Sequence, residues 1–123
     1  MDQLSEKVIG AAIRVHRELG PGLLESAYEI CLAYELQNAG LMIEIQKPLP
    51  VVYRGVKLDC GYRMDIVVEG KLVLELKALE KILPIHEAQL LSYLRLSGIS
   101  LGLIINFHSQ LLKDGIKRLV HNF

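Results

Sequence analysis

Apolar residues in the first forty positions follow the spacing of two helices. The earlier set consists of Leu4, Val8, Ala12, Val15 and Leu19. Steps of three and four place this set on one side of a helix, and Gly20-Pro21-Gly22 ends the pattern. A second helix is predicted over residues 23–38, with Gly40 as its C-terminal cap. Two helices are therefore expected to precede the first strand.

After residue 40 the helical spacing changes to alternation. Residues 41–46 alternate apolar and polar side chains before Pro48 interrupts the pattern, which predicts an edge-like strand. Two hairpins are predicted next, over residues 51–58 with a turn at Arg54-Gly55 and over residues 62–78 with a turn at Glu69-Gly70. The middle of the chain is therefore expected to form a sheet.

The last third of the chain predicts a helix followed by a buried strand. Pro84 suits the first turn of a helix that ends near Gly98. Residues 101–107 are nearly all apolar, which indicates a strand buried on both faces and entered through a helical crossover. Asp114-Gly115 predicts a small C-terminal hairpin. The predicted fold is one α/β domain over residues 1–123, with a mixed central sheet flanked by helices in the order α-α-β-β-β-β-β-α-β.

The composition is that of a folded domain without a strong overall charge. Hydrophobic residues make up 51% and charged residues 23%, which excludes a disordered chain. Fourteen basic and 14 acidic residues balance, so any contact with nucleic acid must be local. Cys31 and Cys60 lack the spacing of a zinc site or a disulfide framework. Because neither a signal peptide nor an apolar run of roughly 18 residues is present, we expect a cytoplasmic protein without a membrane partner.

Charged residues interrupt the apolar hairpin over residues 62–78, and the parity of its loop decides where they lie. An odd loop or an equivalent bulge would place Asp65, Glu75 and Lys77 on one face. The opposite, apolar face would then hold Met64, Ile66, Val68, Leu72, Leu74 and Leu76. A two-residue loop would instead bury Asp65 among leucines at a cost of several kcal/mol. We therefore predict the odd loop.

Two carboxylates and an ammonium group on one face suit a hard cation. Mg²⁺ prefers oxygen ligands and retains several waters, and Mn²⁺ is expected to substitute for it. Beside the cation, Lys77 could orient the attacking water or neutralise charge that develops on a phosphate. The same residues also fit a ladder of surface salt bridges, and their spacing leaves both interpretations open.

Two motifs resemble a known group of proteins. Asp65, nine further residues and then Glu75-Leu76-Lys77 resemble the core signature of the PD-(D/E)XK nuclease superfamily. The segment from Gly22 to Tyr28, GLLESAY, is similar to the motif of the GxxExxY protein family within that superfamily. Met64 departs from the pattern, because proline often precedes the aspartate. The resemblance implies a nuclease-like fold, with Asp65 and Glu75 as metal ligands and Lys77 as the catalytic lysine.

The resemblance also implies roles for residues on two helices. Glu25 would be a third metal ligand, although acidic residues are common in the first turn of a helix. Gln89 and Tyr93 resemble the Q-x-x-x-Y element of helicase-associated nucleases, which would make Gln89 part of the catalytic site and Tyr93 a substrate contact. His86 lies on the same helical face, and ordinary amphipathicity explains such a polar row equally well.

The C-terminal segment contains the densest basic cluster. Lys113, Lys117 and Arg118 are candidate phosphate contacts, although a solvated hairpin explains them too. The sequence thus indicates a Mg²⁺-dependent nuclease that hydrolyses phosphodiester bonds of DNA or RNA. Because the net charge is zero, a homodimer or an accessory protein is expected to help bind substrate. The alternatives are a non-catalytic module with the same fold and an acid–base enzyme that needs no metal.

Overall fold

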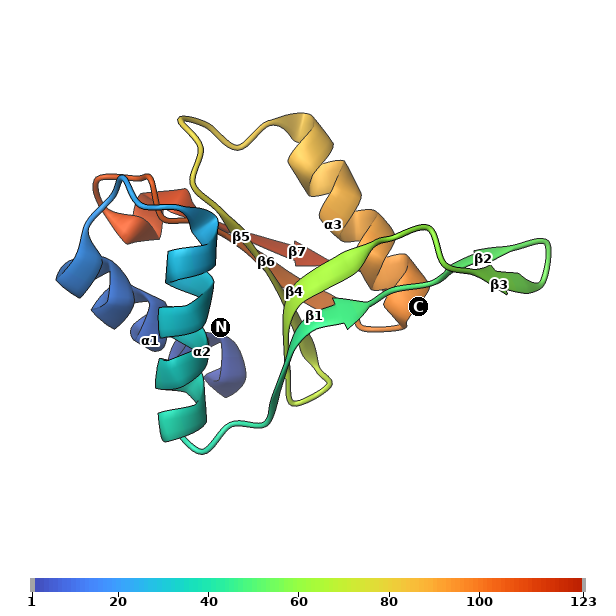
Figure 1. The fold of residues 1–123 in the computed structure, drawn as a ribbon, viewed down its shortest axis with the longest axis horizontal. Coiled ribbons are helices and arrows are strands. Elements are labelled where there is room, and N and C mark those ends of the chain that lie inside the picture. The colour runs from blue at the N-terminus through green and yellow to red at the C-terminus, as the bar shows by residue number, and fades with distance from the viewer. Residues whose placement is uncertain (1, 123) are drawn as a thin grey trace.

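The computed structural model describes residues 2–122, which form a five-stranded mixed sheet with helices on both faces (Figure 1). The elements are α1 (Gln3–Leu19), α2 (Glu25–Asn38), β1 (Ile43–Pro48), β2 (Val51–Tyr53), β3 (Val56–Leu58), β4 (Arg63–Val68), β5 (Leu72–Lys77), α3 (Pro84–Ser97), β6 (Leu101–Asn106), the 3₁₀ turn η1 (Leu112–Gly115) and β7 (Ile116–Val120). The main sheet has the order β1-β4-β5-β6-β7, and β2 pairs with β3 separately. The predicted α/β fold with a mixed central sheet is confirmed.

The sheet separates two apolar clusters. On one face, α1 and α2 pack against residues such as Leu74 and Leu103, whereas on the other face Leu90 of α3 packs against Val73 and Ile104 (Figure 1). Strands β4, β5 and β6 are therefore buried on both sides. This double burial explains why their sequences are nearly continuous apolar runs.

Several local signals in the sequence mark the observed ends of elements. Asp2 caps α1, because its Oδ1 accepts a hydrogen bond of 2.8 Å from the Ser5 backbone N–H. Pro84 begins α3, and Gly98 ends it in the left-handed conformation at φ 77°. At the tip of the β2–β3 hairpin, Arg54 and Gly55 both have positive φ, as a two-residue turn requires.

The C-terminal third confirms one prediction and modifies another. The apolar run beginning at Leu101 is the central strand β6, and it lies parallel to β5 after the α3 crossover. The expected small hairpin around Asp114-Gly115 takes a different form, because η1 leads into β7, which pairs with β6 as the fifth strand of the main sheet. Ile116 and Leu119 of β7 pack against opposite clusters, so joining the sheet partly buries both side chains.

Cys31 and Cys60 are both free thiols. Within residues 2–122, none of the helices combines the length and the apolar character needed to cross a bilayer.

Candidate active site

The loop between β4 and β5 has the predicted odd length. Val68 pairs with Leu72, which leaves the three residues 69–71 between the strands. Glu69 and Gly70 turn the chain with φ of 55° and 63°. The register that gathers the site is therefore confirmed.

Met64 does not share the apolar face predicted for it. It packs in the cluster on the α3 side with Val67, whereas Ile66 packs on the α1–α2 side. The alternation is broken at Asp65, which lies opposite a Gln46 that has a positive φ of 50°. Regular pairs resume on both sides of that position. Asp65 therefore occupies a local distortion of the sheet, which frees its side chain from the apolar layers.

At this distortion, the carboxylates of Asp65 and Glu75 each accept a hydrogen bond from the backbone of the other residue's strand. Glu75 Oε2 accepts a hydrogen bond of 3.0 Å from the Asp65 backbone N–H. Asp65 Oδ2 accepts one of 2.8 Å from the Leu76 backbone N–H. The two carboxylates thus take the place of ladder partners between β4 and β5, and they are held side by side.

Glu75 is an unusual carboxyl group because only 5% of its surface is exposed. Burial, followed by the negative charge of Asp65, raises the pKa of Glu75 to about 8. The positive charge of Lys77, two residues further along β5, opposes this rise in pKa. Asp65 and Glu75 are therefore brought together as a concentration of negative charge, and the charge of Lys77 acts on Glu75.

Helix α2 adds two further carboxylates to the site. A hollow of about 140 Å³ is lined by Glu25, Ser26, Glu29, Gln46, Asp65 and Leu76. Gln46 Nε2 donates to Glu29 Oε1 at 2.6 Å and to Asp65 Oδ1 at 3.2 Å. Burial raises the pKa of Glu29, and the charges of Asp65 and Glu25 add to the effect. Sequence reasoning missed Glu29, although its position four residues after Glu25 predicts that both face the same way.

The loop before α2 explains the spacing of glycine, glutamate and tyrosine in this segment. Gly22 has φ 106°, a value that L-residues rarely adopt. The buried Tyr28 hydroxyl donates to the Gly20 carbonyl at 2.5 Å and accepts from the Leu23 backbone N–H at 3.1 Å. Its ring stacks on Phe107 at a centroid distance of 4.4 Å. Tyr28 therefore anchors the loop that leads into Glu25.

Helix α3 brings Gln89 and Tyr93 to the other side of Glu75. Gln89 Nε2 donates to the Tyr93 hydroxyl at 3.0 Å. Burial raises the pKa of Tyr93, and the nearby charge of Glu75 raises it further. His86 has a structural role instead. Its Nδ1 accepts a hydrogen bond of 2.9 Å from the Leu83 backbone N–H, which caps the helix.

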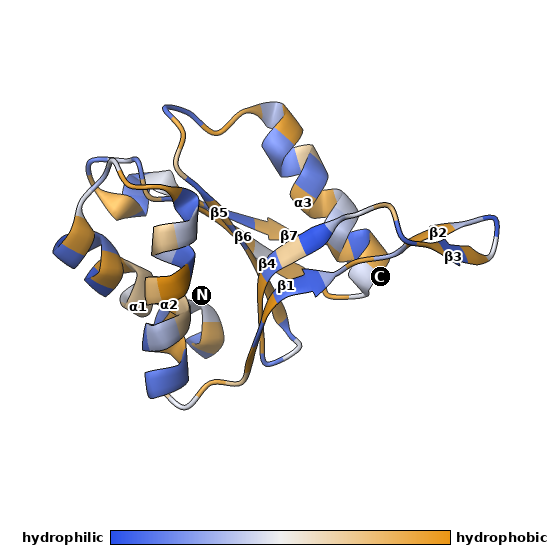
Figure 2. Cartoon of the chain, in the orientation of Figure 1, coloured by the Kyte–Doolittle hydropathy of each residue, from blue (hydrophilic) through white to orange (hydrophobic). Residues whose placement is uncertain are grey.

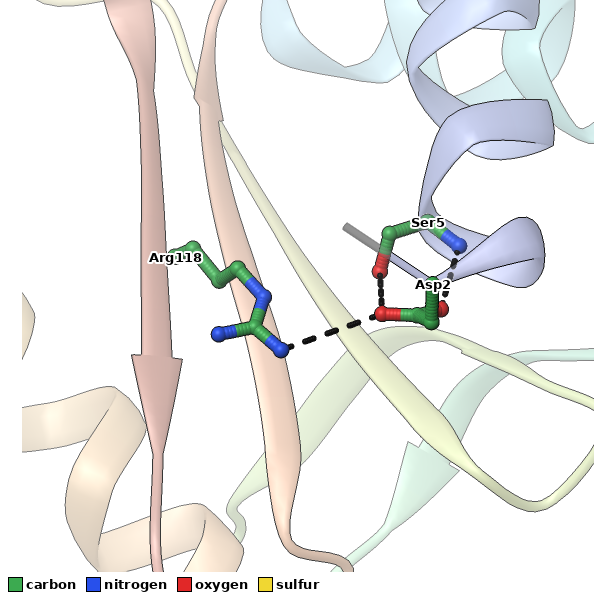
Figure 3. A network of polar contacts seen from close by, with 3 residues as sticks. All are labelled: Asp2, Ser5 and Arg118. Atoms are coloured by element: carbon green, nitrogen blue, oxygen red, sulfur yellow. Dashed lines mark hydrogen bonds and ion pairs between the residues drawn. The ribbon is translucent and has the colours of Figure 1, made fainter.

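The basic C-terminal residues lie apart from the carboxylates, since β6 separates β5 from β7. Lys117 Nζ lies 3.8 Å from Glu87 of α3. Arg118 lies 3.8 Å from Asp2, the residue that caps α1 (Figure 3). Lys113 is exposed on η1. Two of the three predicted phosphate contacts thus have partners within the chain.

The donor set fits a hard divalent cation. Across the described residues, no group of three His, Cys, Asp or Glu side chains is arranged to hold a metal ion. Mg²⁺ nevertheless needs only one or two protein carboxylates, because it keeps waters as its other ligands. Asp65 and Glu75, whose carboxylates bond across β4 and β5, supply two such carboxylates, and Glu25 borders the hollow that Asp65 lines.

Fold and site together define a mixed α/β domain with an acidic site on β4 and β5, beside the position where the pairing of β1 with β4 is interrupted. The model of the PD-(D/E)XK nuclease superfamily matches residues 2–119, so the chain belongs to this superfamily. No curated protein and no solved structure gives a significant match. Nucleases of the superfamily generally use divalent metal ions, and their substrates are nucleic acids.

Proposed function

We propose that this chain is a Mg²⁺-dependent nuclease of the GxxExxY type, which hydrolyses phosphodiester bonds in nucleic acids. The observation that carries the proposal is the reciprocal bonding of Asp65 and Glu75 across β4 and β5. This bonding holds two carboxylates together although their charges repel, and a divalent cation would relieve that repulsion. Membership of the nuclease superfamily supports the same reaction class.

Asp65 and Glu75 would hold the cation, with Glu25 as the third carboxylate. The bound cation supplies Lewis acidity and lowers the pKa of water, which makes hydrolysis possible at neutral pH. Mn²⁺ would substitute for Mg²⁺, because both accept oxygen ligands.

The other residues act on the substrate itself. Lys77 orients the attacking water and neutralises charge that develops on the phosphate. Gln89 and Tyr93, which are hydrogen-bonded to each other, position the sugar–phosphate backbone of the substrate near Glu75. Lys113, Lys117 and Arg118 would contact more distant phosphates. Because the net charge is zero, a second copy or an accessory protein would strengthen the weak binding of a single chain.

A cleavage assay tests the proposal directly. Purified protein is incubated with single- and double-stranded DNA and RNA, with Mg²⁺, with Mn²⁺ or with EDTA. We expect cleavage with either metal and none with EDTA, and we expect Asp65→Asn to abolish it. Asp114→Asn is the matched control, because that exposed aspartate lies on η1. If no substrate is cut and calorimetry detects no Mn²⁺ binding at millimolar concentration, a non-catalytic interaction module replaces the proposal.

A further inference from the structure

A second and larger hollow lies between the β2–β3 hairpin and α3. It has a volume of about 660 Å³. Its walls include Val51, Val52 and Tyr62 on the hairpin side and Ile85, Gln89 and Tyr93 on α3. Figure 1 shows the hairpin projecting away from the sheet near the C-terminal end of α3. We refer to this hollow as the hairpin groove.

The hairpin exposes apolar side chains that pack against neither cluster. Val52 is 50% exposed, Tyr53 60% and Val56 55%. Figure 2 shows the hydrophobic residues of β2 on this projecting arm. A two-stranded hairpin is marginally stable by itself, and contiguous exposed apolar surface usually marks a binding site.

The segment that carries the hairpin is positively charged although the whole chain is neutral. Residues 47–63 contain four cations and one carboxylate. Lys47 pairs with Glu44 at 2.9 Å. Arg54, Lys57 and Arg63 form no ion pair with any residue in the described range. An anionic ligand matches this basic segment better than an apolar peptide does.

The hairpin groove shares Gln89 and Tyr93 with the candidate active site. Tyr62 packs edge-to-face against Tyr93, with ring centroids 5.9 Å apart. Tyr93 in turn is hydrogen-bonded to Gln89. Burial raises the pKa of the Tyr93 hydroxyl, and the negative charge of Glu75 raises it further. Tyr62 also precedes Asp65 by only three residues. A chain lying in the groove would therefore contact Gln89 and Tyr93, the α3 residues assigned to the candidate active site.

We infer that the hairpin groove binds the unpaired bases of single-stranded nucleic acid, while Arg54, Lys57 and Arg63 contact its phosphates. Apolar and aromatic walls match the flat faces of bases, and these faces are hidden in a duplex by stacking. This inference rests on the proposed function and specifies its substrate. DNA and RNA share the chemistry of base and phosphate, so the test includes both.

Binding is measured without metal, which separates this inference from catalysis. Fluorescence anisotropy in EDTA compares labelled oligothymidylate, oligouridylate and a duplex of about 15 nucleotides, a length near the upper site size of single-strand binders. We expect at least one of the two single strands to bind about tenfold more tightly than the duplex. Stacking of one base on an aromatic ring contributes about a factor of ten to the affinity. The comparison of oligothymidylate with oligouridylate shows whether DNA or RNA binds more tightly.

Two groove variants and matched controls locate the binding surface. Tyr62→Ala should weaken single-strand binding about tenfold, whereas Tyr34→Ala on α2, across the sheet, should not. Val52→Glu adds a carboxylate to an exposed wall position and should also weaken binding. Circular dichroism shows whether each variant is folded.

Charge variants test the basic residues of the hairpin segment in the same assay. Arg54→Asn with Lys57→Gln should lower the affinity and reduce the slope of log K against log salt by about 1.4, because each phosphate contact to a single strand contributes about 0.7. Asparagine is chosen at position 54 because it tolerates the positive φ there. Lys7→Gln with Arg17→Gln removes two exposed charges from α1 and should change neither quantity.

Three results would overturn the inference. They are a duplex that binds as tightly as the single strands, equal effects of Tyr62→Ala and Tyr34→Ala, and no strand binding at all. If sedimentation also shows self-association that Val52→Glu abolishes, the hairpin groove is an interface between copies of the chain. If the strands bind but Mn²⁺ supports no cleavage, the inference stands and the proposed nuclease activity fails.

Discussion

At the scale of single residues, Asp65 and Lys77 are expected to affect metal binding in opposite ways. Asp65→Asn removes an anionic ligand, so the affinity for Mn²⁺ should fall. Lys77→Ala removes a cation beside Glu75, so the affinity should stay the same or rise while cleavage is lost. Isothermal titration calorimetry with Mn²⁺ measures this difference. Lys71→Ala in the exposed loop of the same hairpin is the control, and a lost affinity in Lys77→Ala would contradict the assigned role.

Glu75 should make the metal-free protein less stable as the pH rises. Its pKa is about 8 in the folded chain, against an ordinary value of 4.5. Between these values the folded state binds more protons than the unfolded state, so the free energy of unfolding falls as pH increases. The slope from this group is at most about 1.4 kcal/mol per pH unit.

Urea denaturation in EDTA between pH 5 and pH 8 measures this slope. Glu75→Gln should flatten the dependence and stabilise the metal-free protein at pH 8, because a neutral amide replaces a buried charge. Identical slopes for the two proteins would show that Glu75 titrates normally.

At the scale of elements, the loop between α1 and α2 should control how Glu25 meets the site. Tyr28→Phe keeps the ring stacked on Phe107 and removes the hydrogen bonds to Gly20 and Leu23. The expected loss of stability is about 1–3 kcal/mol, because buried backbone groups lose their partner. If the loop positions Glu25, Tyr28→Phe should also lower the affinity for Mn²⁺, measured at a temperature well below the melting temperature.

Tyr34→Phe is the matched control for that experiment, since this tyrosine lies on the same helix and is 64% exposed. It should leave both stability and Mn²⁺ affinity unchanged. A Tyr28→Phe protein that loses stability but keeps its Mn²⁺ affinity would limit Tyr28 to a structural role.

At the scale of the whole molecule, metal binding should stabilise the native state. A ligand that binds only the folded chain adds RT ln(1 + [L]/Kd), about 2.7 kcal/mol at a hundredfold excess over Kd. Differential scanning fluorimetry with and without Mn²⁺ should therefore show a higher melting temperature with metal. Glu75→Gln should lose most of this shift, whereas Glu18→Gln on the exposed face of α1 should keep it. An unchanged shift in Glu75→Gln would exclude that residue as a ligand.

Much of the fold could be predicted because local signals and burial agree. The steps of three and four before Gly20, the proline at position 84 and the glycine at position 98 all mark observed helix boundaries. The apolar run at residues 101–107 predicted a central strand, since only a strand covered on both faces tolerates it. The odd loop at residues 69–71 followed from the cost of burying Asp65.

The sequence by itself determined most helices and strands, because they depend on local periodicity. It also determined the loop parity and the pairing of Asp65 with Glu75, because these depend on neighbours along one hairpin. Only the tertiary structure placed Met64 on the α3 side and brought Glu29 and Gln46 to Asp65. Only it formed the groove between the hairpin and α3. The physical reason is that these features depend on a backbone distortion at Gln46 and on contacts between elements far apart in the chain, which periodicity does not encode.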